Sequence, residues 1–295
     1  MTLTRIAVIG KRGQVVSSLI ERSAGVAEIV TLGRPELDLV DQQSVVRALE
    51  SQRPDVVVNP AAYTMVDKAE DDAEMAMRVN AIGAGNVASA AARLGVPIIH
   101  LSTDYVFDGA LERPYREDDP TGPTGVYGRT KLEGEKRVAA EWGNHVILRT
   151  AWVYSPFGVN FVRTMLSLAK NRVEIGVVGD QKGNPTSALD IADGVLTIAQ
   201  RLSRDPSTAL RGVFHLTGKG EASWADLAEE IFAQARRHGG TSVLVKRIAT
   251  ADYPTPARRP ANSRLDNTRL QTIYAISLPD WRASLAQCVD RLLAK

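Results

Sequence analysis

The amino-acid sequence predicts an α/β fold: a doubly wound parallel sheet of the Rossmann kind, with a smaller α/β lobe that binds substrate. Two observations lead to this prediction. Short, almost wholly apolar runs recur along the first half of the chain, as expected of strands buried on both faces of a parallel sheet. Segments of helical period separate these runs, which is the spacing of βαβ units.

The first half of the chain supplies the regular part of this pattern. Strands are expected at 6–9, 28–32, 55–58, 98–102 and 145–149. Helices are expected at 14–21, 44–49, 67–93 and from about residue 127 or 129 onward, where good helix formers follow one another. Together these segments predict a cofactor-binding Rossmann domain over residues 1–154.

The pattern beyond residue 155 is less regular. Helices are expected at 161–170, 188–202, 224–238 and 279–293, with short strands at 174–178, 213–216 and 243–246. The run 253–260 contains three prolines, so it fits neither a helix nor a central strand. We therefore expect residues 155–295 to form mainly the substrate lobe, with some segments interleaved with the Rossmann sheet.

Composition and charge favour a cytoplasmic enzyme. Of the 295 residues, 44% are hydrophobic and 24% charged, and the formal net charge is only +2, which argues against nucleic-acid binding. No apolar run is long enough to cross a membrane, and the charges at Lys11 and Arg12 break the first apolar run too early for a secretory signal. Cys288 is the single cysteine, which excludes an internal disulfide.

A glycine turn after the first strand indicates nucleotide binding. Gly10 and Gly13 stand between a buried strand and a helix, where backbone N–H groups at a helix N-terminus can bind a pyrophosphate. The third glycine of the usual fingerprint is replaced by Val16, so the motif is incomplete.

The end of the second expected strand indicates which nucleotide binds. An acid there would bind the ribose hydroxyls of NAD, whereas this strand ends in Arg34, which with Arg12 could reach a 2′-phosphate. NADPH is therefore favoured, with NADH possible, although Arg34 could also be a plain turn residue. The expected cofactor set is Gly10, Arg12, Gly13, Gln14, Val15, Arg34, Asp38, Leu39, Ala61, Ala62, Tyr63, Tyr127 and Lys131.

Tyr127 and Lys131 are the candidate catalytic pair. They lie four residues apart, so on a helix they project from the same face. An ammonium beside a phenol lowers the pKa of the phenol, which suits a tyrosine for acid–base work. Thr103 ends the fourth strand and could complete a site that holds a carbonyl oxygen. Trp152, after the fifth strand, could stack on a sugar or belong to the core.

These motifs together resemble the extended short-chain dehydrogenase/reductase family, and within it the dTDP-4-dehydrorhamnose reductase branch. The resemblance rests on five segments in the same order along nearly the whole chain: 59–70, 102–109, 126–135, 149–154 and 259–265. It implies NADPH-dependent reduction of the 4-keto group of a dTDP-sugar, dTDP-4-dehydro-L-rhamnose, as the last step of dTDP-L-rhamnose synthesis.

The resemblance also implies residue roles. Tyr127 would donate the proton, Lys131 would hold the nicotinamide ribose, and Thr103 would bind the substrate oxygen. Asp104, Tyr105 and Trp152 would contact the deoxysugar, and the expected nucleotide-sugar side is Arg259, Asn262 and Ser263. Some relatives hold Mg²⁺ between subunits through glutamates. Leu189 and Val15 stand where such acids would be sought, so a metal is doubtful and none is expected.

Two other functions remain open. A methionine adenosyltransferase regulatory subunit resembles the same family, so a non-catalytic NADP-binding partner is one alternative, although it would not need Thr103, Tyr127 and Lys131. A nucleotide-sugar epimerase or dehydratase of the same fold is the other, and it would retain NAD between turnovers. The sequence leaves the oligomeric state open between monomer and homodimer. His100 and His215 are expected to be core residues.

Overall fold

A six-stranded parallel sheet forms the larger part of the protein. The computed structural model describes residues 3–240 and 242–294. The strand order is β10-β5-β4-β3-β1-β2, and every neighbouring pair is parallel. The bounds are β1 Thr4–Ile9, β2 Ala27–Leu32, β3 Val56–Asn59, β4 Ile98–Thr103, β5 His145–Thr150 and β10 Gly212–His215. The predicted Rossmann sheet is confirmed, and its order reverses between β1 and β3, where such sheets bind ligands.

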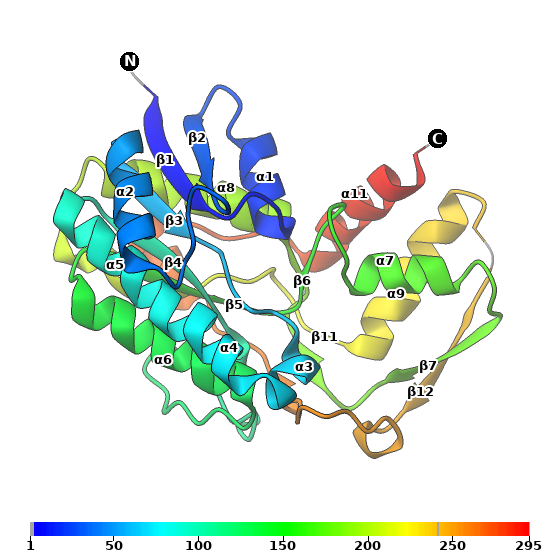
Figure 1. The fold of residues 1–295 in the computed structure, drawn as a ribbon. Coiled ribbons are helices and arrows are strands. Elements are labelled where there is room, and N and C mark those ends of the chain that lie inside the picture. The colour runs from blue at the N-terminus through cyan, green and yellow to red at the C-terminus, as the bar shows by residue number, and fades with distance from the viewer. Residues whose placement is uncertain (1–2, 241, 295) are drawn as a thin grey trace.

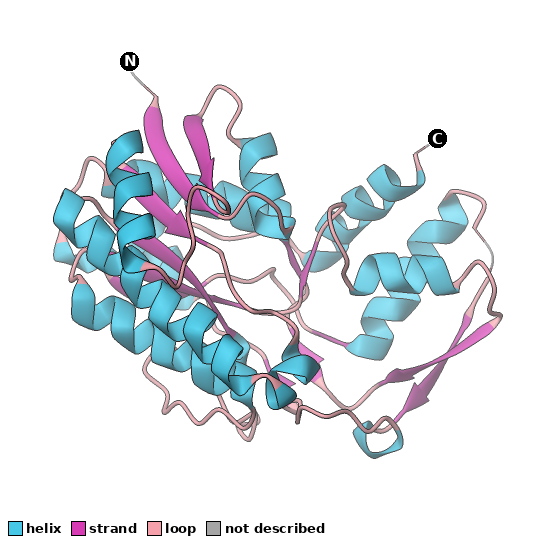
Figure 2. Ribbon diagram, in the orientation of Figure 1, coloured by secondary structure: helices cyan, strands magenta, loops and turns pink. Residues whose placement is uncertain are grey.

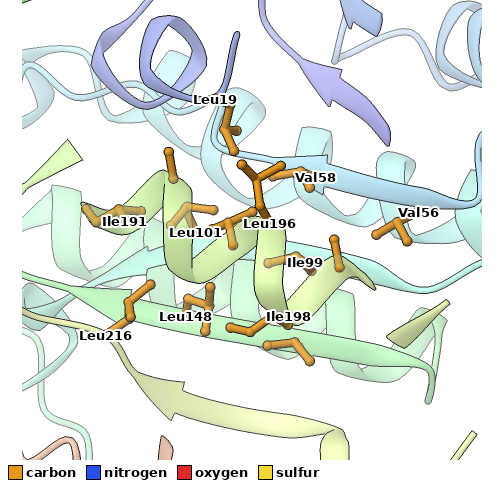
Figure 3. Packing of buried hydrophobic residues seen from close by; sticks show 14 of the residues in the cluster. Leu19, Val56, Val58, Ile99, Leu101, Leu148, Ile191, Leu196, Ile198 and Leu216 are labelled. Carbon is orange, nitrogen blue, oxygen red and sulfur yellow. The ribbon is translucent and has the colours of Figure 1, made fainter. Parts of the chain in front are cut away.

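Helices cover both faces of this sheet (Figure 1). One face carries α1 (Gln14–Arg22), α8 (Ala188–Leu202) and α10 (Thr268–Tyr274). The other face carries α2 (Gln42–Gln52), α5 (Gly83–Leu94) and α6 (Val126–Glu141). Alternate residues of each strand point to opposite faces, so Val56 and Val58 join the first core and Val57 the second. Figure 3 shows Ile191, Leu196 and Ile198 of α8 packed on this first face.

The helix expected over residues 67–93 is interrupted, which corrects the sequence prediction. It consists of α3 (Val66–Asp71), α4 (Ala73–Met77), a π-helical turn η1 (Arg78–Ile82) and α5. Asp72 leaves the helical region, with φ −128° and ψ 44°. In the π turn, the buried Asn80 accepts a hydrogen bond from the Tyr63 amide and donates one to Thr130 Oγ1 on α6. The widened turn thus serves a tertiary contact that helical propensity does not encode.

The smaller lobe lies beside the carboxyl ends of the large sheet. Its helices are α7 (Phe161–Leu168), α9 (Trp224–Arg237) and α11 (Trp281–Leu293), packed around a core of their own. Its parallel strand pair is β7 (Glu174–Val178) and β12 (Leu244–Ile248), which Figure 2 shows on the outer side of the lobe. None of the described helices is long and apolar enough to cross a bilayer.

Short elements connect the two parts. The two-residue strands are β6 Val153–Tyr154, β8 Lys182–Gly183, β9 Thr186–Ser187, β11 Ala222–Ser223 and β13 Asn262–Ser263. The 3₁₀ turns are η2 Asp104–Val106, η3 Thr208–Leu210 and η4 Thr250–Asp252. Strand β10 and helix α8 come from the second half of the chain but complete the large sheet and its cover.

Candidate active site

The glycine turn after β1 borders a depression of about 480 Å³ at the carboxyl edge of the sheet. Gly10 and Gly13 have φ values of 115° and 123°, a backbone conformation that other residues rarely adopt. Gly13 is the N-cap of α1, so free backbone N–H groups of the first turn face this region. The lining residues are Ile9, Gly10, Arg12, Gly13, Gln14, Val15, Val16, Pro60, Ala61, Ala62, Thr64, Leu101, Ser102, Tyr127, Lys131, Thr150, Val153, Gly158 and Val159.

Val16 takes the place of the missing third glycine without filling the turn. Its side chain is buried, and its Cγ2 atom lies 3.4 Å from the position that a Cβ on Gly10 would occupy. The valine therefore packs under Gly10 from the helix side. A valine is therefore tolerated at the third position of the fingerprint, because Gly10 and Gly13 still adopt the backbone conformation that the turn requires.

A second depression of about 300 Å³ continues from the same turn along the end of β2. Arg34, Asp38 and Leu39 line it, together with Lys11, which the sequence reasoning did not select. Arg34 Nη2 lies 3.0 Å from Asp38 Oδ2, and Lys11 pairs with Glu36. Both cations are therefore already paired with carboxylates, and a 2′-phosphate would be bound by exchanging these pairs for phosphate contacts. Arg12 lines the first depression instead.

Tyr127 and Lys131 stand on the first turns of α6 and line the same depression as the glycine turn. The helix approaches the 3₁₀ turn η2 closely at Gly128, where an added Cβ would lie 2.2 Å from the Tyr105 carbonyl oxygen. Lys131 is buried, and its Nζ donates to the Leu101 carbonyl oxygen at 2.6 Å. Burial lowers the pKa of Lys131 to about 8, although the negative charge of Glu135 acts in the opposite sense.

The pKa of Tyr127 differs from the sequence expectation. Desolvation, followed by the charge of Asp104, raises it to about 12, and hydrogen bonding with Thr103 opposes this rise. The lowering that we expected from Lys131 is absent, and burial sets the direction of the shift. The phenol is consequently protonated at neutral pH, which is the state in which a tyrosine can give a proton to a carbonyl oxygen.

Asp104 is the carboxylate whose charge raises the pKa of Tyr127. Thr103 Oγ1 donates to Asp104 Oδ1 at 3.0 Å, whereas the buried Oδ2 atom has no hydrogen-bond partner within residues 3–240 and 242–294. Desolvation raises the pKa of Asp104 to about 6, opposed chiefly by hydrogen bonds from Ser263 and Thr103. A buried acceptor without a partner is costly, so Oδ2 is suited to a hydroxyl group of a bound ligand.

The other residues expected on the substrate side gather at this end of the sheet but differ in their contacts. The Tyr105 and Tyr127 rings lie edge to face with centroids 5.5 Å apart. Trp152 has a φ of 49° and stacks on Trp224 at 3.7 Å, so a second indole backs the first. Asn262 donates to the carbonyl oxygens of Leu111 and Arg113, and Arg259 pairs with Asp67; both side chains are therefore engaged within the protein.

Two residues predicted near the cofactor have contacts within the protein as well. The Tyr63 hydroxyl donates to Asp72 Oδ2 at 3.1 Å, and Tyr63 does not line either depression. Gln14 lines the first depression, and its Oε1 atom accepts hydrogen bonds from Ser155 and Asn160. Gln14 thereby connects the glycine turn to the loop that enters the smaller lobe.

Sequence reasoning missed several lining residues. Thr150, at the end of β5, lines the depression as Lys131 does, and its buried hydroxyl has no hydrogen-bond partner in the part of the chain that the structure describes. The position of Thr150 at the end of a predicted strand is the sequence feature that could have identified it. The sequence around Ser102 and Val159 has no comparable feature. Among residues 3–240 and 242–294, no group of three or more His, Cys, Asp or Glu side chains could hold a metal ion.

Comparisons with known proteins find relatives that match nearly the whole chain. A family model described as RmlD substrate binding domain covers residues 4–294. A dTDP-4-dehydrorhamnose reductase of Sinorhizobium fredii is 52% identical over 98% of both chains, and one of Escherichia coli K12 is 40% identical over 97% of both. The chain belongs to the dTDP-4-dehydrorhamnose reductase family.

Solved structures of this family have the same backbone fold as this chain. A dTDP-4-dehydrorhamnose reductase of Clostridium acetobutylicum gives a TM-score of 0.90 at 39% identity and covers 98% of this chain and 99% of its own. A dTDP-4-dehydrorhamnose reductase of Bacillus anthracis, solved in complex with NADP, gives a TM-score of 0.91 at 32% identity and covers 99% of this chain and 100% of its own. The resemblance predicted from sequence motifs is thus confirmed for a reductase family with an NADP-bound member.

Proposed function

We propose that this protein reduces the 4-keto group of dTDP-4-dehydro-L-rhamnose with NADPH to give dTDP-L-rhamnose. The observation that carries the proposal is that Tyr127 and Lys131 both line the depression that the glycine turn borders, with Thr103 in hydrogen-bond reach of Tyr127. Relatives at up to 52% identity carry the name of this reductase, and one structural neighbour is an NADP complex.

The two depressions fit the cofactor. Gly10 and Gly13 leave room for a pyrophosphate against the N-terminus of α1, and Arg34 lies where a 2′-phosphate would be bound. The unpartnered Thr150 hydroxyl is free to meet a polar group at the nicotinamide end. When bound, NADPH supplies the hydride to the carbonyl carbon of the substrate.

The residues of the chain supply orientation and the proton. Tyr127, protonated because burial raises its pKa, gives its phenolic proton to the carbonyl oxygen. Lys131 holds the nicotinamide ribose and stabilises the phenolate that remains. Thr103 binds the substrate oxygen, and Asp104, Tyr105 and Trp152 bind the deoxysugar. Holding ketone and acid together in this way provides a large part of the rate.

The wider setting follows from this reaction. We propose residues 1–154 as mainly the cofactor domain and 155–295 as mainly the nucleotide-sugar lobe, a cytoplasmic location, and no metal requirement. The protein would act as a monomer or a homodimer. Its product would serve the synthesis of cell-surface polysaccharide such as lipopolysaccharide O-antigen.

The test follows NADPH oxidation with dTDP-4-dehydro-L-rhamnose in wild type and Tyr127→Phe. We expect kcat to fall by about 10²–10⁴ in the variant while NADPH binding persists. Tyr274→Phe is the control, because that hydroxyl donates to the Leu210 carbonyl oxygen in the core behind the sheet. A folded wild type that binds NADPH without turnover would favour a regulatory subunit, and tightly retained NAD would favour an epimerase.

A further inference from the structure

Trp152 adopts a backbone conformation that a bulky side chain rarely takes. Its φ of 49° lies in the left-handed region, where glycine or asparagine would be less strained. The chain changes sheets at this point, because Thr150 pairs with Thr103 in the large sheet and Val153 begins the separate pair β6–β9. A strained aromatic residue kept at the edge of a candidate site indicates that its ring is needed there.

Two neighbours place the Trp152 ring. The ring stacks on the indole of Trp224, with ring centroids 3.7 Å apart and ring planes 9° from parallel. Its edge occupies the space of the side chain that Gly183 lacks, because a Cβ on Gly183 would lie 2.4 Å from Trp152 Cε2 and 2.6 Å from Nε1. Trp224 is itself in contact with Phe161, at a centroid distance of 4.8 Å. The position of Trp152 therefore depends on residues of other elements.

A three-stranded sheet of two-residue strands brings these neighbours together. Its order is β11-β8-β13, so Gly183 of β8 pairs with Ala222 on one side and with Ser263 on the other. Trp224 follows β11 directly, as the first residue of α9. Residues in register on neighbouring strands point to the same face. The Trp152 ring, which fills the place of a Gly183 side chain, consequently lies beside Ser263.

Ser263 connects this ring to Asp104. The Ser263 hydroxyl hydrogen-bonds the Asp104 carboxyl, whose buried Oδ2 atom has no hydrogen-bond partner among the described residues. Trp152 also packs against the hydrophobic cluster that contains Val106 and Phe107, just after this aspartate in the chain. A sugar ring presents hydroxyl groups at its rim and C–H groups on its faces. An acceptor without a partner beside an indole therefore suits a sugar.

We propose that Trp224 is a positioning residue for the sugar substrate and acts by holding the Trp152 indole beside Asp104. The proposal rests on the proposed function in taking the deoxysugar as the ligand. Trp224 is fixed in turn by the capping box of α9, in which Ser223 and Asp226 each accept a hydrogen bond from the backbone amide of the other. The smaller lobe thus determines the position of a ring that follows β5 of the large sheet.

The first experiment tests whether the two rings are stacked in solution. Stacked indoles couple their far-ultraviolet transitions and give a circular dichroism couplet that requires both rings. We expect Trp152→Phe and Trp224→Phe to lose the same couplet from the wild-type spectrum. Trp142→Phe is the control and should retain it, because that indole packs in the core on the α2 and α5 face and donates to the Val96 carbonyl oxygen. A wild type without a shared couplet would overturn the proposal.

The second experiment measures KM for dTDP-4-dehydro-L-rhamnose in Trp224→Leu. We expect KM to rise about three- to tenfold, the effect of losing one stacked aromatic pair, while kcat and the Kd for NADPH change by less than about twofold. Trp224→Phe keeps a ring and should recover most of the loss. Trp142→Leu, which removes another half-buried indole, should leave KM unchanged. A merely structural role would lower the folded fraction, and with it kcat, but not raise KM.

A double variant tests whether Trp224 acts through Trp152. Adding Trp224→Leu to Trp152→Leu should raise KM no further, because the ring that Trp224 holds is already absent. Gly183→Ala disturbs the same ring from its other neighbour, so it should raise KM for the sugar without weakening NADPH binding. Effects of the two leucine variants that multiply in the double variant would contradict an action through Trp152.

The outcomes separate this proposal from the reductase assignment. An unchanged KM in folded Trp224→Leu, with an active wild type, would refute the role of Trp224 alone. A wild type that binds NADPH but does not turn over would refute the proposed function, and with it the sugar as the ligand. If Trp224→Leu does not fold, Trp224→Met fills more of the space and is measured by the same comparison.

Discussion

The buried ion pair between Glu135 and Arg149 gives the sharpest stability prediction. Both residues are 4% exposed. Arg149 Nε and Nη2 donate to the two carboxylate oxygens at 2.9 and 2.7 Å, and Ser102 Oγ donates to Oε1 at 2.5 Å. Arg149 Nη1 is buried and has no hydrogen-bond partner among the described residues, so the guanidinium relies on this one carboxylate to balance its charge. Glu135→Gln removes that charge while nearly preserving the shape of the side chain.

The expected loss can be worked from this geometry. Removing one member of a buried ion pair costs about 3–5 kcal/mol, because the other charge stays buried without compensation. Glutamine can still accept from Arg149, which places the expected loss near the lower end, about 3 kcal/mol. Glu133→Gln on the same helix is the matched control. Glu133 also pairs with an arginine, Arg137, but at the surface, where such a pair contributes about 0.5 kcal/mol or less.

The assay is urea unfolding at pH 7, followed by circular dichroism and fitted with a common m-value. Glu135→Gln should lower the free energy of unfolding by several times more than Glu133→Gln does. Equal losses in the two variants, or a gain in stability on Glu135→Gln, would refute the view that Arg149 depends on this carboxylate.

Three further results are expected. Gly134→Ala should destabilise by about 1–3 kcal/mol in urea unfolding, because its Cβ would lie 2.2 Å from the Asn80 carbonyl oxygen, whereas Gly143→Ala meets nothing within 4 Å and should be near neutral. Asp104→Asn should lower kcat yet stabilise the fold by up to about 3 kcal/mol at pH 7. The pKa of Asp104 in the folded state is about 6, above the ordinary 3.8, so the wild type loses stability as the carboxyl ionises between these pH values. The free energies of unfolding of the wild type and of Asp104→Asn should therefore coincide below about pH 4. Arg34→Ser should raise KM for NADPH about tenfold and leave KM for NADH nearly unchanged; equal effects on both would exclude a 2′-phosphate contact.

Local patterns predicted most of the sheet and the position of the site. Apolar runs such as 6–9 and 145–149 are strands because burial on both faces demands continuous hydrophobicity. The glycine turn and the Tyr127–Lys131 spacing placed the depression, since both depend on residues close in sequence. Contacts between distant residues were not predictable in this way. The π turn at Asn80, the pairing of Glu135 with Arg149 and the contact of His100 with Lys131 arise only when α6 packs on β4 and β5.

The predicted direction of the Tyr127 pKa shift was wrong for the same reason. Sequence spacing indicates that a lysine is near the phenol, but it does not indicate how deeply the phenol is desolvated. In the folded protein desolvation is the larger effect, and the pKa rises. Sequence spacing therefore predicted that Tyr127 and Lys131 line the same depression, but not the balance between charge and burial that sets the pKa of the phenol.

The position of β10 has a consequence for how the chain can be divided. This edge strand pairs with β5, and α8 covers the adjoining face, although both come after the chain has entered the smaller lobe. A fragment that ends at residue 154 would leave the N–H and C=O groups of β5 open and a row of aliphatic side chains uncovered, which invites aggregation. Residues 1–154 and 155–295 therefore cannot be exchanged between relatives as separate modules. New substrate specificity would have to arise by altering side chains within one jointly folded unit.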